Sequence, residues 1–270
     1  MFNLLRMDLY RMIRSRAVYI CLGIMLGLSI LCCFMVWMFE TPEGQNMALR
    51  LGMVEISELA EMEAVGSVLE EMDFLEMFRD MGMDGGSHCT MLGIVVALFV
   101  CMDFNSGYIK NIMSSHRNRW GYVVSKVLAV GILNFGLIVI SLLFTLLANL
   151  VLHMVPFVSP AQILFYLAWA WLVSTAFAAL IILICVLTRS TAMGVLGAVF
   201  IGSGMVTVAA SAFTDLFHMG RWVEYTLYFN LSYGPSAYSG AGDLKVFVVG
   251  LVFLVLYSLA AAVVLKKQDI

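Results

Sequence analysis

Residues 103–126 read DFNSGYIKNIMSSHRNRWGYVVSK and separate two long apolar runs. The only acid in this stretch is Asp103, and its bases are Lys110, Arg117, Arg119 and Lys126. On insertion scales each charge costs about 2.5–3.5 kcal/mol at the centre of a bilayer, so we expect the stretch to lie outside the hydrocarbon. Lys- and Arg-rich connections of this length are typical of the cytoplasmic side. Residues 103–126 are therefore the predicted cytoplasmic loop around which the rest of the chain is arranged.

The composition indicates a membrane protein. Of 270 residues, 62% are hydrophobic and only 12% are charged, whereas soluble domains are about 45–50% apolar and about 25% charged. We therefore predict an all-α polytopic membrane protein. The six cysteines fall nearly all within apolar runs and form neither a CxxC pair nor a spacing with histidine that suits a metal. Buried small hydrophobes are the favoured interpretation, and no metal site is expected.

Residues 1–16 predict a basic amphipathic helix that lies in the membrane interface. The apolar positions recur at helical spacing between four arginines, and they are Phe2, Leu5, Leu9, Met12 and Ile13. A signal peptide is the rival interpretation. Residues 17–39, however, are apolar over a length that spans a bilayer and have no small-residue cleavage site behind them, so we predict a retained first span.

Residues 40–86 differ in charge, with twelve acids against Arg50 and Arg79 alone. Their apolar residues keep a helical spacing, so we predict one or two amphipathic helices in an extracytoplasmic insertion between the first two spans. An outer cap packed on the spans is favoured over an acidic vestibule that meets a cationic ligand, because charge runs are usually solvated faces.

Five further spans are predicted, at residues 87–104, 127–152, 163–187, 192–213 and 246–265, after the first at 17–39. The second is short but is kept because the charges of its flanking loops demand a crossing. With both termini cytoplasmic in the cell membrane, inner segments hold eleven Lys or Arg residues and outer segments hold four. That asymmetry favours six spans in a single domain covering 17–270.

Two spans carry polar residues at helical spacing. The third has Asn134, Ser141, Thr145 and Asn149 on one face, and the fifth has Ser203, Thr207 and Ser211. Hydrogen bonding between helices is the favoured interpretation, and the polar lining of a translocation path is the alternative.

No motif in the chain predicts chemistry of its own. The sequence contains no GxxxxGK[ST], HExxH or GxSxG. The histidines are scattered over loops or span ends without a partner at ligand spacing, and the apolar runs contain no acid or base. We therefore expect no enzyme activity and no cofactor in this chain. An intramembrane enzyme is disfavoured, because the sequence shows no paired acid and base and no nucleophile with a partner.

The chain resembles the permease subunits of ATP-binding-cassette exporters of the second export class, and most of all the bacterial lantibiotic- and bacitracin-immunity type. The resemblance rests on a basic amphipathic N-terminal helix, six spans, and a loop after the second span that reads Asp103-Phe-Asn-Ser-Gly107-Tyr-Ile-Lys110. Members of the family commonly carry an acid four residues before a Gly-Thr pair. Asp103 and Gly107 fit this pattern, but Tyr108 stands where the threonine is expected.

The resemblance implies two permease chains, identical or different, each docked on a separate ATPase subunit that binds ATP and Mg. The loop after the second span would then contain the helix that couples to the ATPase, with the candidates Asp103, Gly107, Lys110, Ser114, Arg117 and Arg119. A dimer interface or translocation path near the first, second and fifth spans would involve Gly23, Gly27, Ser203, Thr207 and Ser211.

The expected cargo is an amphipathic peptide or lipid-like compound, as in antimicrobial-peptide immunity, and no nucleic acid partner is expected. The alternative is a membrane sensor that binds a cationic peptide without transporting it.

Overall fold

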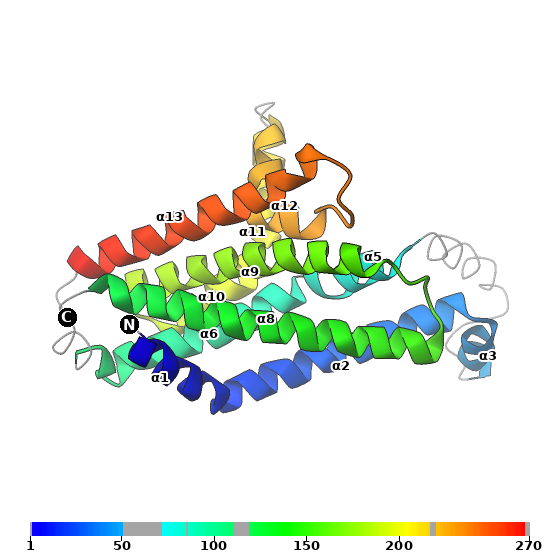
Figure 1. Cartoon of the computed structure of the whole chain (residues 1–270), viewed down its shortest axis with the longest axis horizontal. Coiled ribbons are helices and arrows are strands. Elements are labelled where there is room, and N and C mark those ends of the chain that lie inside the picture. The colour runs from blue at the N-terminus through cyan, green and yellow to red at the C-terminus, as the bar shows by residue number, and fades with distance from the viewer. Residues whose placement is uncertain (1, 51–71, 85, 111–118, 217–219, 268–270) are drawn as a thin grey trace.

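The computed structural model describes residues 2–50, 72–84, 86–110, 119–216 and 220–267. Over these ranges the chain is helical and has no β-strand, so the all-α prediction is confirmed for them. The long helices lie along one another in an elongated bundle (Figure 1).

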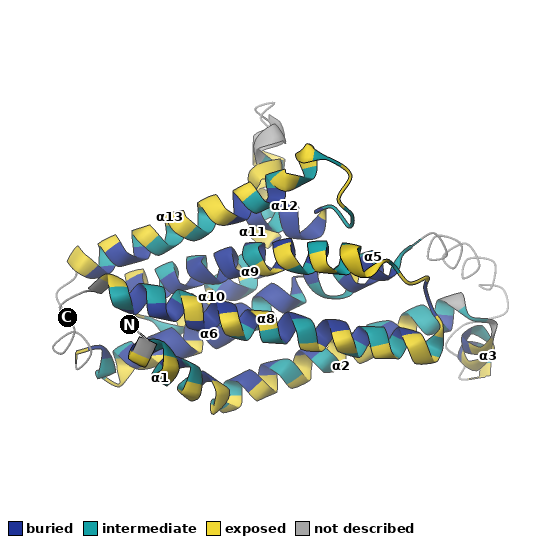
Figure 2. Cartoon of the chain, in the orientation of Figure 1, coloured by how far each residue is buried: buried dark blue, intermediate teal, exposed yellow. Residues whose placement is uncertain are grey.

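Five helices are long and apolar enough to cross a membrane. They are α2 (Arg16–Glu40), α6 (Ser87–Asn105), α8 (Arg119–Leu152), α9 (Pro160–Thr188) and α13 (Lys245–Lys267). The central helix is α9, which is mostly buried, whereas α2 is exposed along most of its length (Figure 2). The prediction of a polytopic helical membrane protein is confirmed at this level.

Short helices flank the long ones. At the N-terminus α1 (Phe2–Ile13) packs against α8, at the same end of the bundle as the end of α13 (Figure 1). The other short helices are α3 (Pro42–Arg50), α5 (Phe74–Arg79), the π-helix η2 (Asp80–Asp84), η3 (Gly220–Tyr225), α12 (Leu227–Ser232) and η4 (Ala241–Leu244). The acidic segment is helical where it is described, and residues 51–71 lie outside the described ranges.

The predicted fifth span at 192–213 is not one continuous helix. It divides into α10 (Thr191–Gly202) and α11 (Met205–Leu216), which are bent by 60° relative to each other. Within the described ranges there are five candidate spans, or six if this bent pair counts as one. At the break Gly204 has φ +76, and the ring of Tyr228 occupies the space that a Cβ there would need. Only glycine suits both conditions, so the bend is built into the sequence at this position.

Close packing of α10 on α6 explains why α10 stays in the bundle while α11 leaves it. A Cβ on Gly93 would lie 2.6 Å from Cβ of Ala198, and one on Gly194 would lie 2.8 Å from Cβ of Ala97. These small residues let the two backbones approach closely. Beyond the break, α11 points away from the bundle and is largely exposed (Figures 1 and 2).

The loop predicted at 103–126 is shorter than expected, which is a correction. Helix α6 continues through Asp103 to Asn105, and α8 begins at Arg119 rather than at 127. The sequence argument ended the second span at residue 104 and began the third only after Lys126. In the folded chain Asp103 and Lys126 are both buried within these helices.

Candidate functional site: a buried charge network beside the central loop

Helix α1 packs on the bundle through a face that carries an acid. Leu4, Asp8 and Met12, spaced four residues apart, are all buried. Ile13, one of the apolar positions of this helix, is 57% exposed. The position that decides its packing is Asp8, the only acid in the first sixteen residues.

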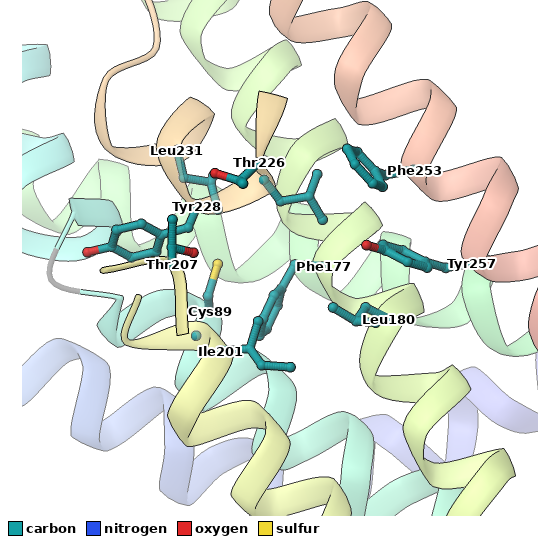
Figure 3. A pocket seen from close by; sticks show the side chains of 12 residues that line it. Cys89, Phe177, Leu180, Ile201, Thr207, Thr226, Tyr228, Leu231, Phe253 and Tyr257 are labelled. Carbon is teal, nitrogen blue, oxygen red and sulfur yellow. The ribbon is translucent and has the colours of Figure 1, made fainter. Parts of the chain in front are cut away.

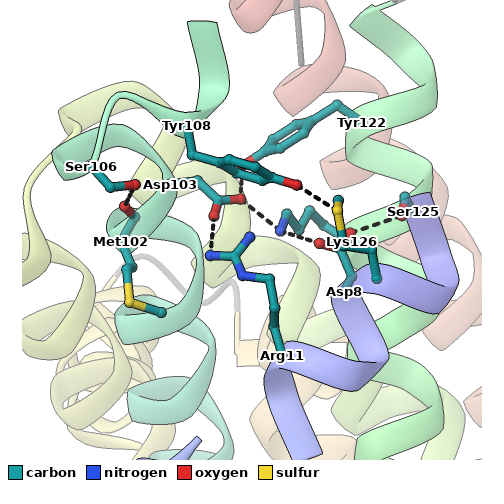
Figure 4. Close-up of polar contacts among 10 residues, drawn as sticks. Asp8, Arg11, Met102, Asp103, Ser106, Tyr108, Tyr122, Ser125 and Lys126 are labelled. Atoms are coloured by element: carbon teal, nitrogen blue, oxygen red, sulfur yellow. Dashed lines mark hydrogen bonds and ion pairs between the residues drawn. The ribbon is translucent and has the colours of Figure 1, made fainter. Parts of the chain in front are cut away.

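Lys126 bridges two carboxylates from different helices (Figure 4). Its Nζ lies 2.7 Å from Oδ1 of Asp8 on α1 and 2.7 Å from Oδ2 of Asp103 on α6. Arg11 extends the network, with Nη2 2.8 Å from Oδ1 of Asp103. The side chains of Lys126 and Asp103 are fully buried. Two bases thus balance two acids at the junction of α1, α6 and α8.

Hydroxyl groups complete the hydrogen bonding of both carboxylates. The Tyr122 hydroxyl donates to Oδ2 of Asp103 at 3.0 Å, and the Ser125 hydroxyl donates to Oδ2 of Asp8 at 2.8 Å. Each oxygen of both carboxylates therefore has a partner from a neighbouring helix. The carboxylates of this network are thus fully satisfied, whereas Nη1 of Arg11 is buried without a hydrogen-bond partner among the described residues.

Aromatic rings cover the two cations. Nζ of Lys126 lies 3.9 Å from the ring centroid of Phe99, and Cζ of Arg11 lies 4.6 Å from that of Tyr108. Partial burial lowers the pKa of Arg11, but the Asp103 carboxylate beside it more than offsets this, so the pKa is raised. The pKa of Tyr108 is raised, mainly by burial. Arg11 thus stays charged and Tyr108 neutral.

We expect this network to fix the arrangement of the helices more than it adds to the free energy of folding. Burying an ion pair costs several kcal/mol per ion, which mutual attraction only partly offsets. Removing one partner, by contrast, costs about 3–5 kcal/mol because it leaves an unpaired buried charge. The network therefore strongly disfavours any arrangement in which α1, α6 and α8 separate.

The predicted coupling residues divide into three groups. Asp103 lies at the centre of the network. Gly107 follows α6 with φ +68, its N–H donating to the Phe104 carbonyl at 3.2 Å, and Lys110 beyond it is exposed. The other candidates are Arg119, which is the first residue of α8, and Ser114 and Arg117, which lie outside the described ranges.

Sequence reasoning missed the partners of Asp103. It placed Lys126 in the loop and found no acid or base within the apolar runs, so it did not foresee that Asp103 and Lys126 both lie within α6 and α8. A signal was present in the sequence. Asp8 is a lone acid on a basic helix, and Lys126 is a lone base at the edge of an apolar run.

The polar face of the third span points into the protein. Asn134, Ser141, Thr145 and Asn149 are all buried. The Asn149 side chain accepts from the N–H groups of Met154 and Val155 and so closes the turn that follows α8. These bonds agree with the favoured interpretation of the face as hydrogen bonding within the bundle.

The residues predicted for an interface or path are not brought together. Gly23 and Gly27 are exposed on α2, and nothing lies within 4 Å of where their Cβ atoms would be. Ser203 caps α10 at the break, whereas Thr207 and Ser211 lie on α11 beyond it. The prediction that these three share one helix face is wrong, because the 60° bend separates Ser203 from the others.

Thr207 lines a cavity of about 150 Å³ beside the break (Figure 3). The wall is mostly apolar and comes from α6, α9, α12, α13 and both halves of the bent pair. Its members include Cys89, Phe177, Ile201, Tyr228, Phe253 and Tyr257. The Tyr228 hydroxyl donates to the Asp84 carbonyl at 2.6 Å, so this ring is fixed and closes one side of the cavity.

A scan against protein-family models found no match to this chain, and a search of the curated proteins found none either.

Proposed function

We propose that this chain is the membrane-spanning permease subunit of an ATP-binding-cassette exporter, with ATP and Mg bound by a separate subunit. Its cargo would be an amphipathic peptide or lipid-like compound, as in antimicrobial-peptide immunity. The observation that supports this most is the buried network of Asp8, Arg11, Asp103 and Lys126 beside the basic loop.

The network suits a coupling role because it joins the loop to three helices. Residues 106–118 connect the end of α6 to the start of α8. Lys126 on α8 contacts acids on α1 and α6. A partner that grips this loop would therefore move α1, α6 and α8 together as one rigid body, which is how a nucleotide-driven push reaches membrane spans.

Exposed surfaces on the single chain are compatible with a second permease subunit. Among the described residues, nothing lies within 4 Å of where the Cβ atoms of Gly23 and Gly27 on α2 would be. Small residues spaced by four allow close approach of a second helix in a membrane. In the proposed assembly, α2 therefore contributes to the dimer contact.

Affinity purification of the tagged chain from its native membranes tests the proposal. We expect a protein that carries a GxxxxGK[ST] motif to co-purify with the parent chain. Replacing Arg117→Glu together with Arg119→Glu should remove it, because the docking surface then has the opposite charge. The double variant Lys266→Glu and Lys267→Glu, which reverses the charge of two other basic residues in the last turn of α13, should retain it.

Unchanged co-purification by the Arg117→Glu, Arg119→Glu variant would contradict the proposal. So would full activity of a chain in which residues 106–118 are replaced by a short Gly-Ser linker. That second result would favour a membrane sensor that binds a cationic peptide without transport.

A further inference from the structure

A small second cavity, of about 20 Å³, lies between α2, α6 and α8 beneath α5 and η2. Its wall includes three methionines and a histidine, namely Met25, Met81, Met83 and His88. The space is large enough for one water molecule or one ion.

Hydrogen bonds between Asn134 and α9 determine which ring nitrogen of His88 carries the proton. The hydroxyls of Ser174 and Thr175 donate to the carbonyls of Ala170 and Trp171, respectively. Each hydroxyl has one proton, so its oxygen must accept from the Asn134 side chain, whose Nδ2 lies 2.8 Å and 3.0 Å away. The amide nitrogen of Asn134 therefore faces α9.

The amide oxygen of Asn134 consequently faces α6, where it lies 2.9 Å from Nε2 of His88. Because that oxygen can only accept, Nε2 carries the proton and Nδ1 of the neutral ring keeps its lone pair. Histidines that bind metals almost always donate their other ring N–H to an oxygen in this way. His88 is thus held as a ligand would be.

The other donors in the wall are thioethers and the hydroxyls of Ser29, Ser87, Ser141 and Thr145. Met25 and Met83 are buried, and Met81 is partly buried, with its Sδ 4.0 Å from Sγ of Cys33. Thioether sulfur and imidazole nitrogen together favour a soft monovalent cation such as Cu(I) over Mg²⁺ or Ca²⁺, which prefer oxygen.

The charge of the wall favours a monovalent ion. No carboxylate lines this cavity from α2, α5, η2, α6 or α8. A divalent ion would leave two positive charges uncompensated inside the bundle, at a greater cost than one. Among the residues described, no group of three or more His, Cys, Asp or Glu is placed to hold a metal, which disfavours zinc.

One polar group in the wall has no hydrogen-bond partner among the described residues. Oγ of Ser141 is buried without a hydrogen bond. Thr145, one turn away, donates its own proton to the Ser141 carbonyl at 3.0 Å. Buried hydroxyls are nearly always satisfied by protein or by an ordered ligand, so this one independently indicates an occupant of the cavity.

We propose that this cavity is a binding site for Cu(I), with Nδ1 of His88 and the thioethers of Met25, Met81 and Met83 as ligands. The site is independent of the coupling loop and of any ATPase partner.

Cu(I) titration of the full-length protein, purified in detergent under reducing conditions, tests this proposal in competition with a chromogenic chelator. The parent chain should bind one more Cu(I) than the Met25→Leu, Met83→Leu variant, or bind that ion at least about tenfold more tightly. Leucine keeps the volume and removes the sulfur. Copper X-ray absorption should show imidazole nitrogen together with sulfur in the parent chain.

Two further variants complete the test. Met102→Leu with Met205→Leu removes two exposed sulfurs away from the cavity and should bind as the parent does. His88→Gln should lose the imidazole signal. The cysteines are common to all four chains and cancel in the comparison. Equal stoichiometry and affinity in the parent chain and in both cavity variants would overturn the proposal and leave the cavity as a site for water only.

Discussion

At the scale of single residues, Lys126 is the group on which the proposed site depends. Among the ion pairs of the described chain, its buried ammonium is the only cation within 4 Å of Asp8. It also contacts Asp103, which Arg11 contacts as well. Burying a cation within a membrane protein costs free energy unless an acid pairs with it. Ionisable residues are therefore rare inside membrane proteins, and those present usually mark functional regions.

Replacing Lys126→Met should destabilise the protein strongly. The change leaves Asp8 without an ionic partner in a buried position, and we expect a loss of about 3–5 kcal/mol in the free energy of unfolding. Thermal unfolding in detergent measures this. Lys110→Met, at an exposed position, is the matched control and should melt as the parent does. Equal melting temperatures for the two variants would show that the network has no energetic role.

A charge-balanced double variant should recover part of that loss. Asp8→Asn combined with Lys126→Met removes one acid and one base, and Arg11 remains to pair with Asp103. We expect the double variant to be more stable than Lys126→Met alone, with a coupling energy of about 0.5–3 kcal/mol. A double variant whose loss equals the sum of the single losses would mean that Asp8 and Lys126 do not interact.

At the scale of the helices, Gly107 and Gly204 each lie in a left-handed turn that favours glycine. Gly107 has φ +68 where α6 ends, and no atom lies within 4 Å of where its Cβ would be. Gly107→Ala should therefore cost about 1–2 kcal/mol through backbone strain alone. Gly121→Ala on α8 also has open space, but in a helix, and should be neutral or stabilising by about 0.5–1 kcal/mol. Melting temperatures that shift alike would contradict the left-handed turn.

A larger effect is expected at the break between α10 and α11, because a side chain there would meet both backbone strain and steric overlap. Gly204 has φ +76, and a Cβ would overlap the Tyr228 ring. We expect Gly204→Ala to cost more than Gly107→Ala, hence above about 1–2 kcal/mol. Gly242→Ala, where nothing lies within 4 Å, serves as the control in the same unfolding assay. A Gly204→Ala protein as stable as that control would favour a continuous fifth span.

The sequence predicted the features that depend on neighbouring residues and missed those that depend on residues far along the chain. Hydropathy located all five long helices, and the spacing of Asn134, Ser141 and Thr145 correctly placed them on one face. Hydropathy failed at Lys126, because a charge paired with residues far along the chain is as buried as an apolar group. It also failed at the α10–α11 break, where a left-handed turn at Gly204 interrupts an otherwise apolar run.

At the scale of the whole molecule, the charge distribution and the fold agree in outline. Helix α1, the segment after α6 and the end of α13 lie at one end of the bundle, and α3 lies at the other (Figure 1). Residues 1–16, 106–126 and 266–267 together hold ten of the fifteen Lys and Arg residues, so the account requires that end to face the cytoplasm. The proposed docking of an ATPase depends on this sidedness.

Labelling of a cysteine placed at Lys110 tests that sidedness most directly. Lys110 and Met47 are both exposed, at opposite ends of the bundle. A membrane-impermeant maleimide applied to intact cells should label Met47→Cys but not Lys110→Cys, above the background of the parent chain, and permeabilised cells should show both. Labelling of Lys110→Cys in intact cells would place the basic loop outside and contradict the account.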